Sequence, residues 1–149
     1  MHPIDYKSLA IERLQSYPAR KASLEGLEQE IRMLEERMTS PRGGASSDST
    51  PVREGGNRYE DRLVTDIAKK EELKWAKERA LFETLRVGNA LNALTDEQRL
   101  ILDRFYMHRQ SGYVERLCEE LGYEKTQIYK MKDDALYLFT LNLYGVIEL

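Results

Sequence analysis

The sequence predicts an all-α fold, in which a long N-terminal helical hairpin or coiled coil precedes a C-terminal three-helix, helix-turn-helix domain. Apolar residues recur three and four positions apart over most of the 149 residues, which is the period of one helix face. A segment rich in Gly, Ser and Pro divides the chain, and a glycine separates two short amphipathic segments near its end. No alternating pattern typical of strands is present, so every regular element is expected to be helical.

Residues 1–38 are the first predicted helical segment. Its apolar residues follow a 3-4-3-4 spacing with charged residues between them, which forms the seam of a coiled coil or a helical hairpin. Pro18 is expected either to break or kink this segment or to begin a second helix, because proline lacks the backbone N–H. The seam residues are Leu24, Leu27, Ile31, Leu34 and Met38.

Residues 39–58, TSPRGGASSDSTPVREGGNR, are predicted to be a flexible linker. The segment has almost no large apolar side chains, so it buries too little surface to offset the entropy of ordering it.

Residues 59–94 are predicted to form a second long helix. Leu73, Ala80, Val87 and Leu94 lie seven positions apart, with Ala76 and Leu91 in alternate seam positions. This helix is expected to fold back on the first as an antiparallel hairpin, or to form a hairpin that also dimerises; the sequence leaves open whether the long helices pair within one chain or between chains. Two helices bury little apolar surface, so a further partner is expected, either the C-terminal domain or a second copy.

Residues 95–149 are predicted to be a compact three-helix domain. Thr95 and Gln98 form a capping box, so the first helix begins at Asp96, and it runs to Met107. The next helices are expected at 113–121 and from 125 to about 144.

The last two helices of this domain resemble a helix-turn-helix in their spacing. Gly122 permits the left-handed backbone that reverses the chain between them. Each helix has one apolar face, which is expected to be buried. The two faces comprise Val114, Leu117, Cys118 and Leu121 in the first helix and Ile128, Met131, Ala135 and Leu138 in the second.

The opposite face of the last helix carries side chains suited to DNA. Lysine binds phosphate or guanine, glutamine pairs with adenine, and threonine and tyrosine reach phosphate or a thymine methyl group. The expected DNA-binding residues are Lys125, Thr126, Gln127, Tyr129, Lys130 and Lys132, with Arg109 from the preceding loop as a candidate phosphate contact.

The segment GYVERLCEELGYEKTQIYKMKDDAL resembles region 4 of bacterial sigma-70 factors. The order of segments along the whole chain is similar to that of small late-gene regulators of the ArpU and RinA type, from prophages of Gram-positive bacteria. This resemblance implies a DNA-binding activator of phage late transcription. It implies double-stranded DNA as a partner and host RNA polymerase as a further candidate. The residues that match the sigma pattern are Glu115, Leu117, Cys118, Leu121, Gly122, Ile128, Ala135 and Leu136.

Two other functions remain open from the sequence. Residues 95–149 hold seven Lys and Arg against ten Asp and Glu, so non-specific DNA affinity is expected to be weak. A homodimer, a local basic patch or a polymerase partner would compensate. The domain could instead be a protein-interaction module that binds RNA polymerase. A phage small terminase subunit is the third possibility, although terminases usually place the DNA-binding part first.

No enzyme, metal or cofactor motif stands out. The chain lacks a glycine-rich phosphate loop and a G-x-S-x-G motif, and its two histidines and Cys118 do not have the spacing of metal ligands. A single cysteine fits a reducing compartment, and the N-terminus has no secretory signal pattern. No apolar run reaches the roughly 20 residues of a membrane span. We therefore expect a cytoplasmic protein of a bacterial host cell that does not bind membranes.

Overall fold

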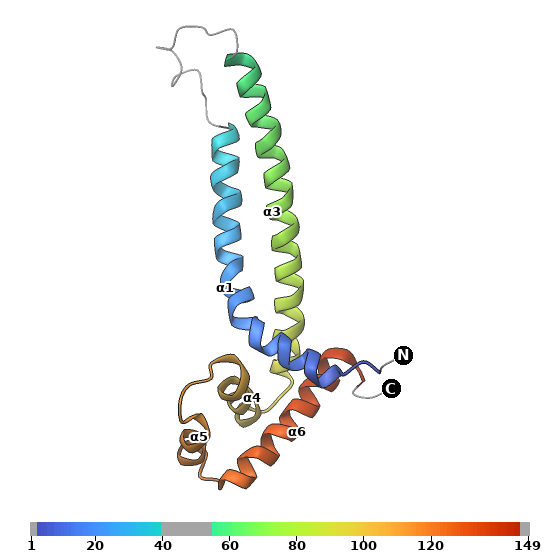
Figure 1. Cartoon of the computed structure of the whole chain (residues 1–149), viewed down its shortest axis with the longest axis vertical. Coiled ribbons are helices and arrows are strands. Elements are labelled where there is room, and N and C mark those ends of the chain that lie inside the picture. Colours follow the sequence, from blue (N-terminus) through green and yellow to red (C-terminus); the bar gives the residue numbers. More distant parts are fainter. Residues whose placement is uncertain (1–2, 40–54, 147–149) are drawn as a thin grey trace. The chain divides into compact units, whose positions relative to one another are not determined.

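The computed structural model describes residues 3–39 and 55–146, and every regular element in them is helical (Figure 1), which confirms the all-α fold. The chain divides into two units: residues 22–81, and residues up to 21 together with those from 82 onward. The elements are α1 (Tyr6–Thr39), α3 (Gly55–Asn92), α4 (Asp96–Leu102), the π-helix η1 (Asp103–Met107), α5 (Tyr113–Leu121) and α6 (Lys125–Tyr144).

Helix α1 is continuous through Pro18, so it neither breaks at this residue nor begins a second helix there. Proline removes one hydrogen bond within a helix, the one that would reach the carbonyl of Leu14. Leu14 is fully buried, and Tyr17 packs against the same core cluster. Packing of the turn that precedes Pro18 therefore supports the helix despite the lost bond.

The helices extend into the predicted linker. Residues 40–54 lie outside the described part of the chain, but Thr39 belongs to α1, and α3 begins at Gly55. The predicted bounds of the linker, 39 and 58, are therefore too wide. Extending an existing helix adds one hydrogen bond for each residue fixed, so a long, packed helix reaches into residues of poor intrinsic propensity.

In the unit of residues 22–81, α1 and α3 lie side by side and antiparallel (Figure 1), as the predicted hairpin requires. Ile31 and Leu34 of α1 are buried in the seam. Ala76 was expected in the seam of α3, but it is exposed. Lys77 takes the seam position instead, because its ammonium reaches the Glu28 carboxylate at 3.6 Å.

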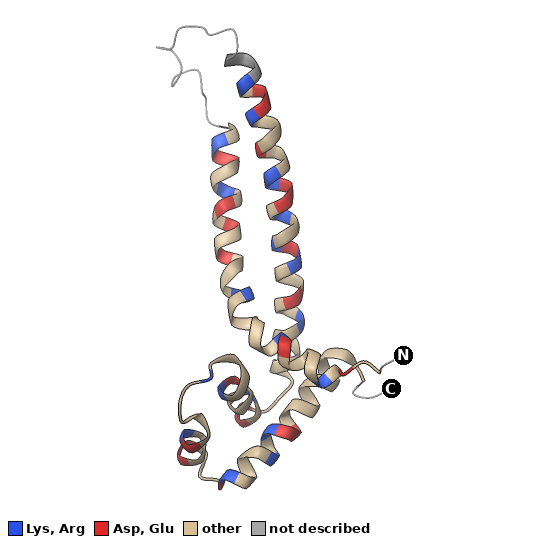
Figure 2. Ribbon diagram, in the orientation of Figure 1, with Lys and Arg blue, Asp and Glu red and all other residues tan. Residues whose placement is uncertain are grey.

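Charged pairs fix the register of the hairpin. Besides the Lys77–Glu28 pair, Lys70 lies 3.7 Å from Glu35. Asp66 is only 3% exposed, and its carboxylate accepts two hydrogen bonds from Arg37, one of them from Nε at 3.0 Å. Figure 2 shows Lys, Arg, Asp and Glu interspersed along both helices. A shifted register would bury Asp66 without its partner, which is costly for a carboxylate.

The other unit packs the start of α1 and the end of α3 with the C-terminal helices. Ala10 and Leu14 from α1 share one core with residues of α3, α4 and α6. Arg99 of α4 donates to the carbonyl of Leu94 at 2.6 Å, just beyond the end of α3, and so links the two helices. The remaining members of this core are Val87, Ala90, Leu91, Leu94, Leu102, Ala135, Leu136, Phe139 and Leu143.

Local predictions in this unit are largely confirmed. The capping box is present, with the Gln98 N–H 3.2 Å from Thr95 Oγ1 and the Thr95 N–H 3.0 Å from Gln98 Oε1. Helix α5 has its predicted bounds, and α6 ends where expected. Leu138 was expected in the buried face of α6, but it is 37% exposed. Phe139 is buried instead, because the second half of α6 packs on the core shared with α1 and α3.

We predict that Arg37→Ala destabilises the hairpin by roughly 1–3 kcal/mol, because it leaves the buried Asp66 carboxylate without a partner. Adding Asp66→Leu should recover most of this loss, since an apolar side chain suits the seam. Thermal unfolding followed by far-UV circular dichroism measures both effects. Arg32→Ala, an exposed change on the same helix, is the matched control. An equal loss of stability in Arg32→Ala and Arg37→Ala would show that the buried Asp66–Arg37 pair does not stabilise the hairpin.

Candidate nucleic-acid interface

Helices α5 and α6 are joined by a tight turn at Gly122. This residue has φ +76°, a left-handed conformation that favours glycine, and its N–H donates to the Cys118 carbonyl at 2.9 Å. Helix α6 then begins at Lys125, three residues after Gly122. The predicted left-handed glycine is therefore confirmed, and a side chain at this position would strain the turn.

A small apolar cluster fixes how α6 is rotated about its own axis. Ile128 is fully buried and shares this cluster with Val114 and Leu117 of α5 and with Ile101 of α4. With Ile128 turned inward, the opposite side of the first two turns of α6 is held in solvent. The rotation thus depends on one deeply buried side chain close to the start of the helix.

Five predicted site residues lie in these two turns: Lys125, Thr126, Gln127, Tyr129 and Lys130. All five are exposed. Within the described part of the chain, neither Lys125 nor Lys130 forms an ion pair, which leaves both ammonium groups to bind an external anion. Together the five residues present two cations, an amide and two hydroxyl groups along about two helical turns.

Lys132 lies differently from the other predicted residues. Its side chain is only 20% exposed, and its ammonium donates to Asp133 Oδ1 at 2.6 Å. The ammonium also lies over the Phe105 ring, 5.7 Å from its centroid. Burial lowers the pKa of Lys132 and the bond to Asp133 raises it, with the balance leaving the pKa above its ordinary value. Lys132 is therefore a charged residue held against the protein itself.

Phe105 is the centre of an aromatic cluster that brings three predicted site residues together. Tyr113 and Tyr129 meet its ring edge-to-face, at centroid distances of 5.0 and 5.7 Å. The Arg109 guanidinium stacks over Tyr113, 4.6 Å from its centroid, while Lys132 covers Phe105. Tyr129 and Lys132 thus meet the buried Phe105 ring directly and Arg109 is linked to it through Tyr113, a grouping that the sequence spacing did not predict.

The π-helix η1 carries Phe105 into this cluster. A continuous α-helix was expected from Asp96 to Met107, but its second half is π-helical. The His108 N–H closes the π turn on the Asp103 carbonyl at 2.7 Å, and its Nδ1 lies 2.7 Å from the Asp103 carboxylate. Arg104 binds Glu120 of α5 through two nitrogens, at 3.1 and 3.3 Å. Single π turns often occur at functional sites.

The surroundings of the interface carry both signs of charge. Figure 2 shows Lys at the start of α6 and acidic residues farther along it, where Asp133 and Asp134 lie. On α5, Glu115 and Glu119 are exposed. Acidic side chains therefore interrupt the basic surface beyond the first turns of α6.

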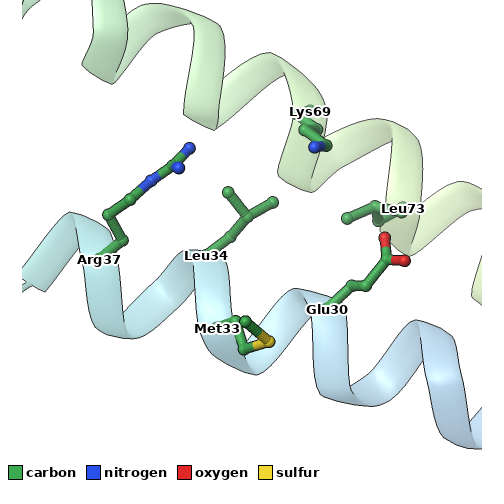
Figure 3. A pocket seen from close by; sticks show the side chains of 6 residues that line it. All are labelled: Glu30, Met33, Leu34, Arg37, Lys69 and Leu73. Atoms are coloured by element: carbon green, nitrogen blue, oxygen red, sulfur yellow. The ribbon is translucent and has the colours of Figure 1, made fainter.

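The hairpin unit has a separate open hollow of about 260 Å³ between α1 and α3 (Figure 3). Met33, Leu34 and Leu73 line it, and charged side chains from both helices border it. One of these, Arg37, is already bound to Asp66.

Neither a metal cluster nor a membrane span is found in residues 3–39 and 55–146. In these ranges no three His, Cys, Asp or Glu residues gather in a way that could hold a metal ion. In the same ranges, no helix is long and apolar enough to cross a bilayer.

Comparison with protein-family models, with curated proteins and with solved structures finds no match to this chain.

We predict that Phe105→Ala lowers the free energy of unfolding by about 3–5 kcal/mol, because it empties the centre of the aromatic cluster. Phe82→Ala is the matched control in the same unit. Phe82 is 61% exposed, and its ring should contribute less than about 1 kcal/mol. Urea unfolding measures both changes, and a similar loss in the two variants would show that Phe105 does not organise the interface.

Proposed function

We propose that this chain is a sequence-specific DNA-binding regulator of transcription that places α6 in the major groove. The observation that carries the proposal is the two-sided character of α6. Ile128 is buried against α5, while Thr126 and Lys130 are exposed on the opposite side, flanked by the exposed Gln127. A turn-linked helix pair with a polar, exposed second helix is how helix-turn-helix proteins meet DNA.

Each exposed residue has a role in this proposal. Lys125 and Lys130 contact phosphate oxygens or guanine, and Gln127 pairs with adenine. Thr126 and Tyr129 bind phosphate or pack on a thymine methyl group. Arg109 lies in the loop before α5 and stacks over Tyr113. In this proposal it contacts the phosphate backbone of DNA.

Lys132 has an indirect role in the proposal. Its ammonium lies 6.0 Å from the Tyr129 ring centroid and is bound to Asp133, so it supports the orientation of Tyr129. Positioning an aromatic side chain before binding reduces the entropy lost when DNA is contacted.

The acidic balance of residues 95–149 implies that one copy binds DNA weakly. A homodimer on two half-sites would double the favourable contacts, which is the usual arrangement for this motif. The sigma-like motif further supports a regulator of phage late genes, acting in the cytoplasm of a bacterial host together with host RNA polymerase.

One observation favours an alternative function. Glu115 and Glu119 expose carboxylates on α5, beside the basic turns of α6. These carboxylates suit a basic protein surface better than they suit DNA. The alternative is therefore a module that binds RNA polymerase and makes little contact with DNA.

We predict that the protein enriches a specific DNA site and that Gln127→Ala/Lys130→Ala abolishes the enrichment. The measurement is a binding selection from fragmented phage and bacterial DNA at moderate salt. Lys7→Ala/Gln15→Ala is the matched control, because it makes the same two changes at exposed positions of α1. This control should retain the selected site.

Other results would contradict the proposal or support an alternative function. If neither the natural chain nor the control enriches any DNA, autonomous DNA binding is wrong, and the polymerase-binding alternative gains support. If Gln127→Ala/Lys130→Ala retains the site, DNA is read by another surface. Ring-shaped oligomers in light scattering would instead support a terminase subunit.

A further inference from the structure

Helix α3 exposes an apolar stripe within the hairpin unit. Val64 is 67% exposed and Trp75 is 66% exposed, and Ile67 and Leu81 are also exposed. We call these four residues, together with the charged Glu71, Lys74 and Glu78 between them, the α3 stripe. Val64, Ile67, Glu71, Trp75 and Glu78 follow one another at intervals of three and four, which places them on one side of the helix.

The α3 stripe is distinct from the hairpin seam. The seam side of α3 is occupied by Asp66, Lys70 and Lys77, each bound to a side chain of α1. Exposed apolar side chains that gather on one face, with charged residues beside them, typically mark a protein interface. A largely exposed tryptophan is especially costly to leave in water, because its large ring contributes strongly to the energy of interfaces.

The charges in the α3 stripe indicate what covers it. Glu71, Lys74 and Glu78 are exposed, and none of them forms an ion pair within residues 3–39 and 55–146. A partner helix must therefore present opposite charges at its middle and apolar residues at both ends. The α3 stripe itself has this pattern when it is read in the reverse direction.

We propose that two copies of the chain pair through the α3 stripe, with the two α3 helices antiparallel. In the register that places Glu71 of each copy opposite Lys74 of the other, Val64 lies opposite Leu81 of the second copy. Trp75 then lies within one turn of Ile67 of the second copy. Glu78 lies beside that same Ile67, where its flexible side chain keeps the carboxylate in water.

A parallel pairing fits the same residues poorly. It would place Lys74 opposite Lys74 and Glu71 opposite Glu71, and like charges that face each other destabilise an interface. The antiparallel arrangement pairs opposite charges twice, once on each side of the twofold axis. The order of the charged residues along the α3 stripe thus favours a second copy of the chain as the partner, with its α3 helix antiparallel.

This interface deepens the homodimer of the proposed function, but it does not depend on DNA binding. All tests use the full chain without DNA. A failure here would leave the role of α6 to its own selection experiment.

The first test uses the intrinsic fluorescence of Trp75, the only tryptophan in the sequence. Its emission should shift to shorter wavelength as protein concentration rises, because pairing removes the ring from water. Sedimentation equilibrium should show a monomer–dimer equilibrium over the same concentrations. An emission that stays constant while a dimer forms would overturn the α3 stripe as its interface, and so would a protein that remains monomeric.

Charge reversal tests the register. Lys74→Glu should weaken dimerisation at least about tenfold, because it places Glu71 opposite a second carboxylate. Adding Glu71→Lys in the same chain should restore dimerisation, since the opposite charges then face each other again. Lys69→Glu makes the same charge change on the hollow side of α3 and is the matched control. An equal loss with Lys69→Glu, or no restoration in the double variant, would contradict the proposed register.

Mixing tests the direction of the helices. In the antiparallel pair, Glu71→Lys/Lys74→Glu chains should avoid differently tagged natural chains, because each mixed contact brings like charges together. A parallel pair predicts the opposite preference, since position 71 would then face position 71 with opposite charges. Preferential capture of the natural chain by the double variant would therefore overturn the antiparallel arrangement.

Discussion

The burial of Ile128 is the constraint on which the proposed DNA interface depends. This side chain lies near the start of α6 and packs with Val114 and Leu117 of α5, so it sets the rotation of α6. The glycine turn fixes where α6 begins, and the buried cluster fixes which side meets water. The exposed position of Gln127 and Lys130 is therefore a consequence of core packing and does not depend on their own interactions.

A second layer of organisation comes from cations held over aromatic rings. Arg109 lies over Tyr113, and Lys132 lies over Phe105. Such contacts are worth about 0.5–1 kcal/mol at exposed sites and more where water is excluded. They restrict the side chains around α6 in a domain whose net charge would otherwise oppose binding to a polyanion. The proposed DNA interface therefore depends on where its charges lie more than on the total charge.

Features set by neighbouring residues were predictable from the sequence. The Thr95–Gln98 capping box and the Gly122 turn each depend on a few adjacent positions, and both are present. Features set by distant packing were not predictable. The π turn at Phe105 leaves the apolar period almost unchanged, and nothing local indicates that Asp66 is buried beside Arg37. The exposure of the five predicted site residues followed from the helical period alone, whereas the grouping of Arg109, Tyr129 and Lys132 required the fold.

The most direct test of the central claim is photo-crosslinking from the solvent side of α6. The photoreactive aromatic residue p-benzoylphenylalanine would replace Tyr129 in one variant and the exposed Tyr59 of α3 in another. Each variant would be irradiated with the DNA site selected by the natural chain. The account predicts strong crosslinking to DNA from position 129 and little from position 59. DNA crosslinks from position 59 alone, or none from position 129 while the site remains bound, would contradict it.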